Sequence, residues 1–424
     1  MPQLMVISML LFFALSVPVA VAIGLASMLG VAYDGMTWLV IAQQIYAALD
    51  KYPLVAVPFF ILAGNLMEAG GISERMVDFA KSVVGGMQGG LACSCVLTCM
   101  IFAAVAGSSV ATTFAVGAIL IPAMVKHGYP KPFSASLQAS AAELGVIIPP
   151  SIPMILFAVS TDTSVGELFI AGIGPGLLIA GALMIYVWVY ARRHGYGKQD
   201  GADRLPLWPA FKRAWLALLM PGIILGGIYG GIFTPTEASA VAVVYALIVG
   251  IFVYRRLTFS TLSKTLHRSV VSTAVIMFVI ANAGVFGFLL NRAGIPSALG
   301  QWLGMVFSDK YTFLMGVNVA LFFIGMFIET SASIVVLAPL LLPVAMQFGV
   351  DPAHFGVLMV VNLALGMVTP PFGVNLFAAC AVANLPIERL VKSLLPFVAV
   401  VLGCLLIITY VPEISLFFKE LAYG

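Results

Sequence analysis

The chain has 424 residues, of which 62% are hydrophobic and 9% charged, and its mean hydropathy is +1.11. Soluble domains carry about a quarter charged residues, so this composition excludes a soluble globular protein and indicates an integral membrane protein. The formal net charge of +3 is too small to provide the basic surface that nucleic acid binding requires.

Apolar stretches long enough to cross a bilayer as helices follow one another along the chain, since about 20 residues span the hydrocarbon core. We expect the first to be a retained helix rather than a signal peptide, because its apolar run is long and no basic residues precede it. The expected spans are about 4–30, 53–70, 133–161, 165–190, 213–233, 236–254, 269–291, 355–383 and 387–411. Amphipathic segments expected to lie at the membrane interface are 36–47, 74–86, 258–268 and 296–306.

Two further apolar stretches, 90–126 and 311–348, are each long enough to enter the membrane twice. Polar residues interrupt both of them in the middle, at Gly107 to Ser109 and at Glu329 to Ser333. Each stretch is therefore either two full spans or a re-entrant hairpin whose tip lies inside the protein. Both alternatives return the chain to the side from which it entered.

In this arrangement, most basic residues lie on the same side of the membrane. Sixteen of the 20 Lys and Arg residues fall on one side, and only Lys51, Arg292, Lys310 and Lys419 fall on the other. Because Lys and Arg collect in cytoplasmic loops, we expect a cytoplasmic N-terminus and a periplasmic C-terminus.

An internal repeat relates the two hairpin regions. Residues 107–175 align with residues 328–396 at a constant offset of 221, and four of the seven prolines in each coincide, where chance predicts about 0.7. A second block aligns Gly71 with Gly294 at an offset of 223. The two copies begin on opposite sides of the membrane, so they form an inverted-topology repeat, as in many secondary transporters.

The expected organisation is a single membrane domain over 1–424. Repeat one covers 53–190 with its hairpin at about 90–126, and repeat two covers 269–412 with its hairpin at about 311–348. The segment 191–268 between them holds a basic cytoplasmic loop, two scaffold helices and an interfacial helix. The fold class is all-α, a polytopic membrane protein with two re-entrant hairpins and broken helices.

Both copies break their helices at two places, a hairpin tip and a double proline at 149–150 or 370–371. A double proline removes two backbone donors, so the carbonyls before it lose their helical partners. Together with nearby hydroxyls, these carbonyls form a set of hard oxygen ligands suited to a small cation, while half-helix N-termini face an anionic group. The candidate cation ligands are Ser108, Ser109, Thr112, Gly145, Ile148, Thr330, Ser331, Ser333, Gly366 and Thr369. The alternative is purely structural: hydroxyls cap the half-helices and prolines kink them.

Candidate substrate-contacting residues lie at the breaks or near an expected mouth: Glu329, Asn375, Pro150, Pro371 and Arg292. Glu143 and Glu329 are the only acids placed within the membrane, which points to function, although Glu143 equally suits a neutral, hydrogen-bonded role. The histidines at 127, 194, 267 and 354 are expected to be solvated. Cys93, Cys95 and Cys99 have no His or carboxylate nearby, so they predict packing rather than a metal site.

Five motifs together resemble the large membrane subunit of tripartite ATP-independent periplasmic (TRAP) transporters, over essentially the whole chain. They begin at Pro58, Ala106, Gly145, Gly231 and Val368, and the last reads Val-Thr-Pro-Pro-Phe-Gly-Val-Asn. The resemblance implies an elevator-type secondary transporter of the bacterial inner membrane, driven by sodium as coupling ion and without another cofactor. It also implies two partners, a small membrane subunit of about four helices, expected as a separate chain, and a periplasmic substrate-binding protein that delivers an organic anion.

By position, the resemblance assigns sodium ligands to the hairpin tips at Ser108–Ser109 and Thr330–Ser333, and to carbonyls around 145–148 and 366–369. It favours a C4-dicarboxylate or related carboxylate as substrate, with sialic acid as the alternative. An enzyme is not expected, because H-E-x-x-H, G-x-S-x-G and P-loop motifs are all missing. A channel or a cation/proton exchanger stays open, since broken helices in inverted repeats also build exchangers.

Overall fold

The computed structural model describes residues 1–197 and 205–423, and these residues form helices without any strand. Within them, eight helices are long and apolar enough to cross a membrane, and the bent pair Lys131–Ile147 and Ile152–Thr161 makes a ninth. The expected all-α, polytopic membrane fold is therefore confirmed. The part of the predicted basic loop at 198–204 lies outside the described residues.

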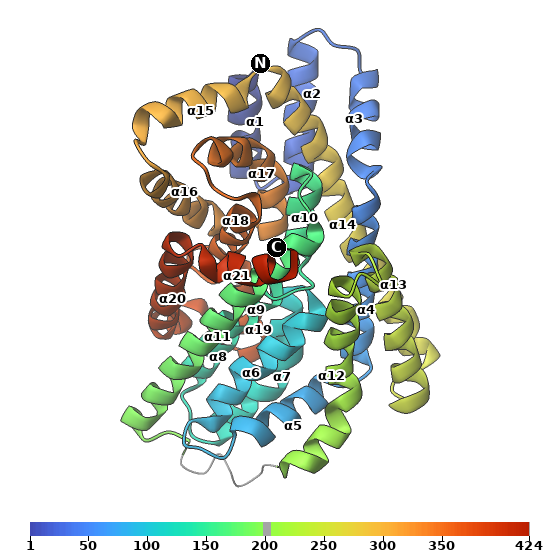
Figure 1. The fold of residues 1–424 in the computed structure, drawn as a ribbon, viewed down its shortest axis with the longest axis vertical. Helices are drawn as coiled ribbons and strands as arrows, with labels where there is room; N and C mark the ends of the chain where they lie inside the picture. The colour runs from blue at the N-terminus through green and yellow to red at the C-terminus, as the bar shows by residue number, and fades with distance from the viewer. Residues whose placement is uncertain (198–204, 424) are drawn as a thin grey trace.

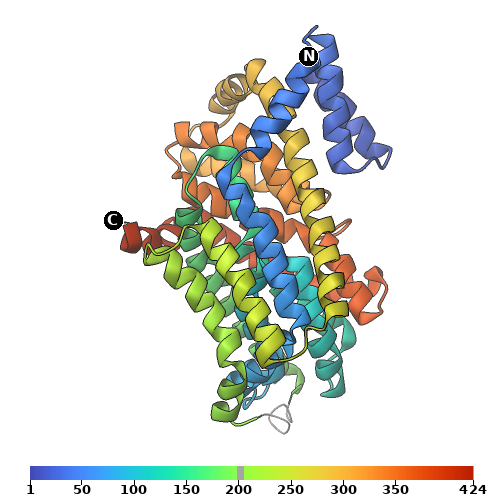
Figure 2. The same cartoon turned by 90° about the vertical axis from the view of Figure 1, so that its right-hand side faces the viewer.

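The first span differs from its prediction. The structure has two short helices, α1 (Pro2–Ala14) and α2 (Val19–Tyr33), in place of one helix over 4–30. Ser16 has a φ of 61° and Pro18 lacks an N–H, so the chain turns back between them. A Cβ added to Gly30 would lie 2.6 Å from Met5 Sδ, so the start of α1 lies beside the end of α2 (Figure 2).

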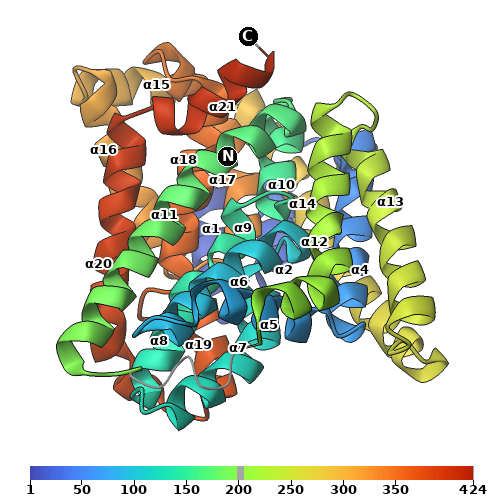
Figure 3. The same cartoon turned by 60° about the horizontal axis from the view of Figure 1, so that its bottom comes forward.

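Helices α4 (Ala56–Ala69), α12 (Leu207–Tyr229) and α13 (Pro235–Ile248) stand side by side at the right of Figure 3. Together with α3 (Leu39–Leu49), η1 (Tyr52–Val55), the π turn η2 (Val249–Val253) that follows α13, and α14 (Phe259–Arg292), they form what we call the scaffold. Helix α4 packs against α13 and α14, and α14 also packs against α2 and α3.

Helix α14 runs for 34 residues without interruption. The predicted separate interfacial helix over 258–268 is therefore wrong. Thr258 caps the start of α14, and neither Gly nor Pro occurs in the helix before Gly284, so nothing ends it between the interfacial and apolar parts.

The remaining helices form a second group, which we call the hairpin body. From the first half of the chain come α5 (Ile72–Val84), α6 (Gly90–Ala106), α7 (Ser109–Lys126), α8 (Lys131–Ala142), α9 (Leu144–Ile147), α10 (Ile152–Thr161) and α11 (Val165–His194). From the second half come α15 (Ile295–Val306), α16 (Lys310–Gly325), α17 (Thr330–Gln347), α18 (Pro352–Met367), α19 (Val374–Ala383), α20 (Ile387–Tyr410) and α21 (Glu413–Tyr423). Figure 1 shows their arrangement.

Helix bounds recur at nearly the same spacing in the two halves. Helices α7 and α17 each have 18 residues and start 221 residues apart, as do the starts of α8 and α18. Helices α5 and α15 start 223 residues apart, each after a glycine with positive φ, Gly71 or Gly294. These spacings equal the offsets at which the sequence repeats.

The second half contains two features that the sequence analysis did not predict. Helix α21 follows Pro412 and packs against α11 and α18. Lys419 of α21 lies 2.9 Å from Asp351 Oδ2 and 3.1 Å from Glu167 Oε2. The expectation of a solvated His354 is wrong, because α16, α20 and α21 pack around α18 and bury that side chain completely.

Candidate cation and substrate site

The tip of the first hairpin is a tight reversal between α6 and α7. Gly107 ends α6 with a φ of 61°, and a Cβ at this position would lie 2.9 Å from the carbonyl oxygen of Pro150. Ser108 caps α7, because its Oγ accepts a hydrogen bond from the N–H of Ala111 at 3.4 Å. Thr112 Oγ1 donates to the carbonyl of Ser108 at 2.8 Å. The tip therefore lies against the first double proline.

The first helix break brings main-chain oxygens and hydroxyls close to that tip. A Cβ added to Gly145 would lie 2.7 Å from Thr112 Oγ1 and 2.8 Å from the carbonyl oxygen of Ser108. Only glycine allows this approach, so Ser108, Thr112 and Gly145 meet at one place. Ile148 is extended after α9, and its side chain packs against Gly176 of α11.

The second hairpin tip is built differently, since a carboxylate replaces the serine cap. Glu329 accepts hydrogen bonds from the N–H groups of Ser331 at 2.9 Å and Ala332 at 3.2 Å, and also from Ser331 Oγ at 2.9 Å. A charged N-cap stabilises the start of α17. Ser333 Oγ is buried without a hydrogen-bond partner.

The second tip meets the second break, as the first tip meets the first. Thr330 Oγ1 donates to Met367 Sδ at 2.9 Å, and Thr369 Oγ1 donates to the carbonyl of Leu365 at 2.7 Å. A Cβ added to Gly366 would lie 2.5 Å from Gly325 Cα, so the two glycines form a close backbone contact. The ten candidate cation ligands thus fall into two groups, one for each half of the chain.

Contacts between the halves join the two groups. Helix α7 packs against α19, and α17 packs against α10. Asn375 Nδ2 donates to Glu143 Oε1 at 2.7 Å and to the carbonyl of Ala139 at 3.0 Å, while its Oδ1 accepts from Thr113 Oγ1 at 2.5 Å. Glu143 is 2% exposed and its Oε2 has no hydrogen-bond partner. Sequence analysis named Asn375 but could not find the contact.

The five candidate substrate residues are not all brought together. Glu329 and Pro371 are exposed at the second break, beside a pair of exposed rings, Phe327 and Phe372, with centroids 5.6 Å apart. Pro150 and Asn375 are buried among helices. Arg292 lies at the end of α14, where its Nε is 3.5 Å from Asp34 Oδ2, so the structure pairs it with α2 rather than with the breaks.

Several cavities lie between the scaffold and the hairpin body, and two of them are lined by the hairpin helices α7 or α17. The first, which we call the tip pocket, has a volume of about 250 Å³. It is lined by Ile61, Gly64, Asn65, Glu68, Phe102, Ala106, Ser108, Val110, Ala111, Ile152, Arg268, Ser272 and Ile276. Arg268 Nη1 lies 3.5 Å from Glu68 Oε2 at this pocket.

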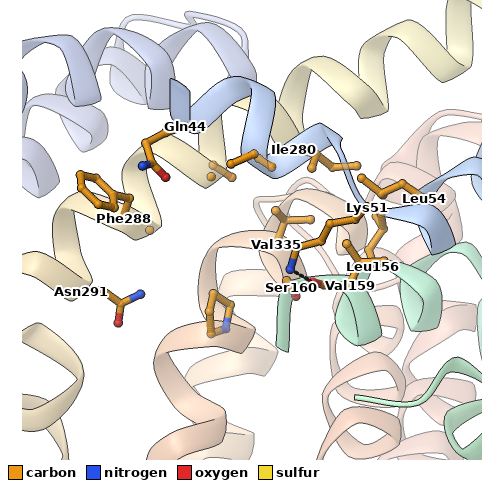
Figure 4. A pocket seen from close by; sticks show the side chains of 16 residues that line it. Gln44, Lys51, Leu54, Leu156, Val159, Ser160, Ile280, Phe288, Asn291 and Val335 are labelled. Carbon is orange, nitrogen blue, oxygen red and sulfur yellow. Dashed lines mark hydrogen bonds between the residues drawn. The ribbon is translucent and has the colours of Figure 1, made fainter. Parts of the chain in front are cut away.

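The second cavity, which we call the α3 pocket, has a volume of about 280 Å³ (Figure 4). It is lined by Gln44, Ala47, Ala48, Lys51, Leu54, Leu156, Val159, Ser160, Ile280, Ala283, Gly284, Gly287, Phe288, Asn291, Val335 and Pro339. Lys51 reaches from the scaffold to α10, where its Nζ donates to the carbonyl of Val159 at 2.7 Å and to Asp162 Oδ1 at 2.9 Å.

The walls of the two pockets correspond to each other through the internal offset. The α4 wall of the tip pocket is Ile61, Gly64, Asn65 and Glu68. Four of the six α14 residues in the wall of the α3 pocket, Gly284, Gly287, Phe288 and Asn291, lie 223 residues after these positions; Ile280 and Ala283 are the other two. Sequence analysis missed both pockets, although the second repeat block already contained the signal. The same helical face therefore lines one cavity in each half.

Comparison with known proteins identifies relatives over nearly the whole chain. The family model described as "Tripartite ATP-independent periplasmic transporter, DctM component" matches residues 6–414. The isethionate TRAP transporter permease protein DctMQ of Oleidesulfovibrio alaskensis is 44% identical over 96% of this chain, which spans 65% of that relative's length. The C4-dicarboxylate TRAP transporter large permease protein DctM of Pseudomonas aeruginosa is 44% identical, covering 89% of this chain and 88% of its own length.

A more distant relative differs in its named substrate. The sialic acid TRAP transporter large permease protein SiaM of Vibrio cholerae is 37% identical over 90% of each chain. Among solved structures, the YdaH transporter of Alcanivorax borkumensis, described as having an unusual topology, matches with a TM-score of 0.64. It covers 91% of this chain and 88% of its own at 18% identity, so the likeness concerns the fold alone.

Proposed function

This chain belongs to the DctM component family of tripartite ATP-independent periplasmic transporters, and we propose that it performs sodium-driven uptake of an organic anion by alternating access. The resemblance found in its motifs is thereby confirmed, and the relatives are named as transporter permeases rather than enzymes. Sodium coupling, the substrate and the movement are the parts that we propose.

The paired pockets are the observation that carries the alternating-access proposal. Equivalent faces of α4 and α14 line one cavity each, and both cavities lie between the scaffold and the hairpin body. In an inverted repeat, equivalent surfaces face opposite sides of the membrane. A substrate held at the breaks would therefore meet the tip pocket on one side and the α3 pocket on the other.

The residues at the breaks fit sodium as the coupling ion. Sodium is a hard cation that prefers oxygen ligands, and the first group offers hydroxyls and carbonyls of Ser108, Ser109, Thr112, Gly145 and Ile148. The approach of Thr112 and Ser108 to Gly145 forms a narrow cradle that a Cβ would fill. The buried, unpartnered oxygens of Ser333 and Glu143 are further support, because such atoms are costly inside a membrane without a ligand. A bound sodium ion would supply positive charge there.

The elevator movement is proposed for the hairpin body against the scaffold. The interface between them is built from small residues at Gly64 of α4 and Ala106 of the hairpin tip, where a Cβ on Gly64 would lie 3.2 Å from Ala106 Cα. Small residues let two backbones approach closely without interlocking side chains. Such a surface permits sliding.

Orientation in the membrane follows from the charged loops, with one change from the sequence expectation. If the loops rich in Lys and Arg face the cytoplasm, the Tyr33 end of α2 faces the periplasm. Because α1 runs antiparallel to α2, Met1 then also lies on the periplasmic side, together with the C-terminus. The cytoplasmic N-terminus followed from counting 4–30 as one crossing.

Two partners complete the proposed transporter of the bacterial inner membrane. A small membrane subunit would replace lipid at part of the scaffold surface, where Trp215, Val244 and Val275 are exposed in this chain. A periplasmic substrate-binding protein would deliver the anion. C4-dicarboxylate, isethionate and sialic acid are named for relatives, and all three are organic anions, so we propose this class as the substrate.

The test is reconstitution of the chain with its small subunit and binding protein in liposomes. We expect electrogenic uptake of one of these anions that requires an inward sodium gradient and the binding protein. Proton or sodium flux that needs no organic solute would instead establish the cation/proton exchanger, the competing function. A potassium gradient of equal ionic strength is the control.

A further inference from the structure

The carboxylate of Glu143 is buried at the junction of three helices. It lies directly after α8, and its Oε1 accepts the 2.7 Å hydrogen bond from Asn375 of α19. Ser109, at the start of α7, lies beside the same carboxylate. Glu143 therefore contacts the first hairpin tip, the first helix break and the second half of the chain at once.

No basic side chain compensates this carboxylate in the part of the chain that the structure describes. The residues around it are the neutral Asn375 and Ser109, and the charged group within electrostatic range is another acid, Glu329. Among the described residues, no group lies within hydrogen-bonding geometry of Oε2, although the Ser109 hydroxyl lies beside the carboxylate. A buried charge of this kind is strongly unfavourable in a membrane protein unless a cation lies nearby.

The position of Glu143 explains where that cation would lie. Two residues further along the chain, Gly145 forms the cradle with Thr112 Oγ1 and the carbonyl of Ser108. Ser109 connects the two, because it follows Ser108 of the cradle in the chain and lies beside the carboxylate of Glu143. In repeat two, the offset of 221 places Ala364 at the position of Glu143, so the second group of ligands has no such charge.

We propose that Glu143 supplies the negative charge that holds a sodium ion at the first hairpin tip and makes this site stronger than its counterpart in repeat two. The inference rests on the proposed sodium coupling and adds a residue to it. Asn375 orients the carboxylate through Oε1, so Oε2 is the atom that faces the ion.

The experiment compares Glu143→Gln with the wild-type chain by thermal unfolding in detergent, titrating sodium chloride against potassium chloride at equal ionic strength. A ligand that binds only the folded state raises the free energy of unfolding by RT ln(1 + [L]/Kd), so the unfolding midpoint rises once the ligand concentration exceeds Kd. The amide keeps the Oε1 acceptor for Asn375 but removes the charge. We expect the sodium concentration that produces a given rise of the midpoint to increase at least tenfold, while the sodium-free midpoint stays equal or increases.

Glu388→Gln is the matched control, because Glu388 is an exposed acid in the first turn of α20. It should leave the sodium response unchanged. An unchanged sodium response in Glu143→Gln would overturn the proposal, while sodium-specific stabilisation of the wild type would leave the proposed function standing. Equal stabilisation of the wild type by both salts would overturn both.

Glu143→Asp provides a second variant should the glutamine variant fail to fold. It retains the charge one methylene shorter, so sodium affinity is expected within about threefold of the wild type. A loss of tenfold or more with a normal sodium-free midpoint would contradict a role based on charge.

Discussion

Asn375 of α19 donates one hydrogen bond to Glu143 Oε1 and another to the carbonyl of Ala139, and it accepts one from Thr113. A single amide from the second half of the chain thus fixes the hairpin and the broken helix of the first half. All its polar atoms are used, and the side chain is fully buried. Asn375 therefore connects the second helix break to the first break and to the first hairpin.

Asn375→Ala is expected to lower the free energy of unfolding by about 2 kcal/mol, because hydrogen bonds to charged groups contribute about 1.5–3 kcal/mol and the partners are left buried. Gln301→Ala is the control, since Gln301 is an exposed amide side chain in the middle of α15. The measurement is denaturation in detergent for both variants. Equal losses would mean that Asn375 does not link the halves.

Ser109→Ala and Ser331→Ala are expected to weaken the dependence of uptake on sodium, each raising the sodium concentration at half-maximal rate. The reason is that each hydroxyl lies at a hairpin tip beside a candidate cation site. Ser94→Ala is the control, because Ser94 is buried in the same hairpin but bonds only to the carbonyl of Gly90. Unchanged sodium activation in both tip variants would exclude the ligand assignment.

Gly64→Leu is expected to abolish transport, because even its Cβ would lie 3.2 Å from Ala106 Cα and the longer side chain would interlock scaffold and hairpin body. Gly222→Leu in α12 should transport normally, since a Cβ there meets nothing within 4 Å. Uptake rates and purified yield are measured together. Normal transport by Gly64→Leu would argue against sliding at this surface.

Lys51→Ala is expected to open the α3 pocket, because Lys51 ties the scaffold to Val159 and Asp162 at the end of α10. The ion pair is largely exposed, so its removal should change stability by less than about 1 kcal/mol. The measurement is labelling of a cysteine at Ser160 by an impermeant maleimide in a Cys380→Ala background, with an expected increase of several-fold. Lys392→Ala, an exposed lysine far along the chain, should leave the rate unchanged.

Lys419→Met is expected to loosen α21 and to lower stability by about 1 kcal/mol at neutral pH. Burial raises the pKa of Asp351, but the hydrogen bond and positive charge of Lys419, together with the backbone N–H groups of His354 and Ala353, hold the pKa below its ordinary value. A depressed carboxyl pKa contributes stability above the unfolded value, and this is lost as the pH falls below about 4.

The difference in unfolding midpoint between wild type and Lys419→Met should therefore be constant between about pH 5 and 8 and shrink in acid. A difference that persists undiminished at low pH would show that the lysine acts through packing of its aliphatic chain instead.

Much of the fold could be predicted from the sequence because membrane insertion requires long apolar runs, and double prolines and glycines mark where helices stop. The failures have local causes. Only Ser16 and Pro18 signal the reversal between α1 and α2, and they lie inside a continuous apolar run. The sequence predicts two separate elements where α14 is one helix, because its residues change from polar to apolar while the helical backbone continues.

The side-chain contacts at the candidate site are harder to predict from the sequence than the helices are. The sequence indicates that Glu143 and Asn375 are polar residues near breaks, but 232 positions separate them and the packing of α8 against α19 brings them together. His354 shows the same limit, since α16, α20 and α21, rather than its own neighbours in sequence, bury it.

The correspondence between the two pockets has a consequence for the resting state of the proposed transporter. If both repeats were identical, a two-fold rotation would relate the conformations that expose either pocket, their free energies would be equal, and the protein would spend equal time in each. Their walls differ, with Asn65 and Glu68 facing one cavity where Phe288 and Asn291 face the other. In the proposed cycle, these unlike pairs would give the two conformations different free energies before any ion or anion binds.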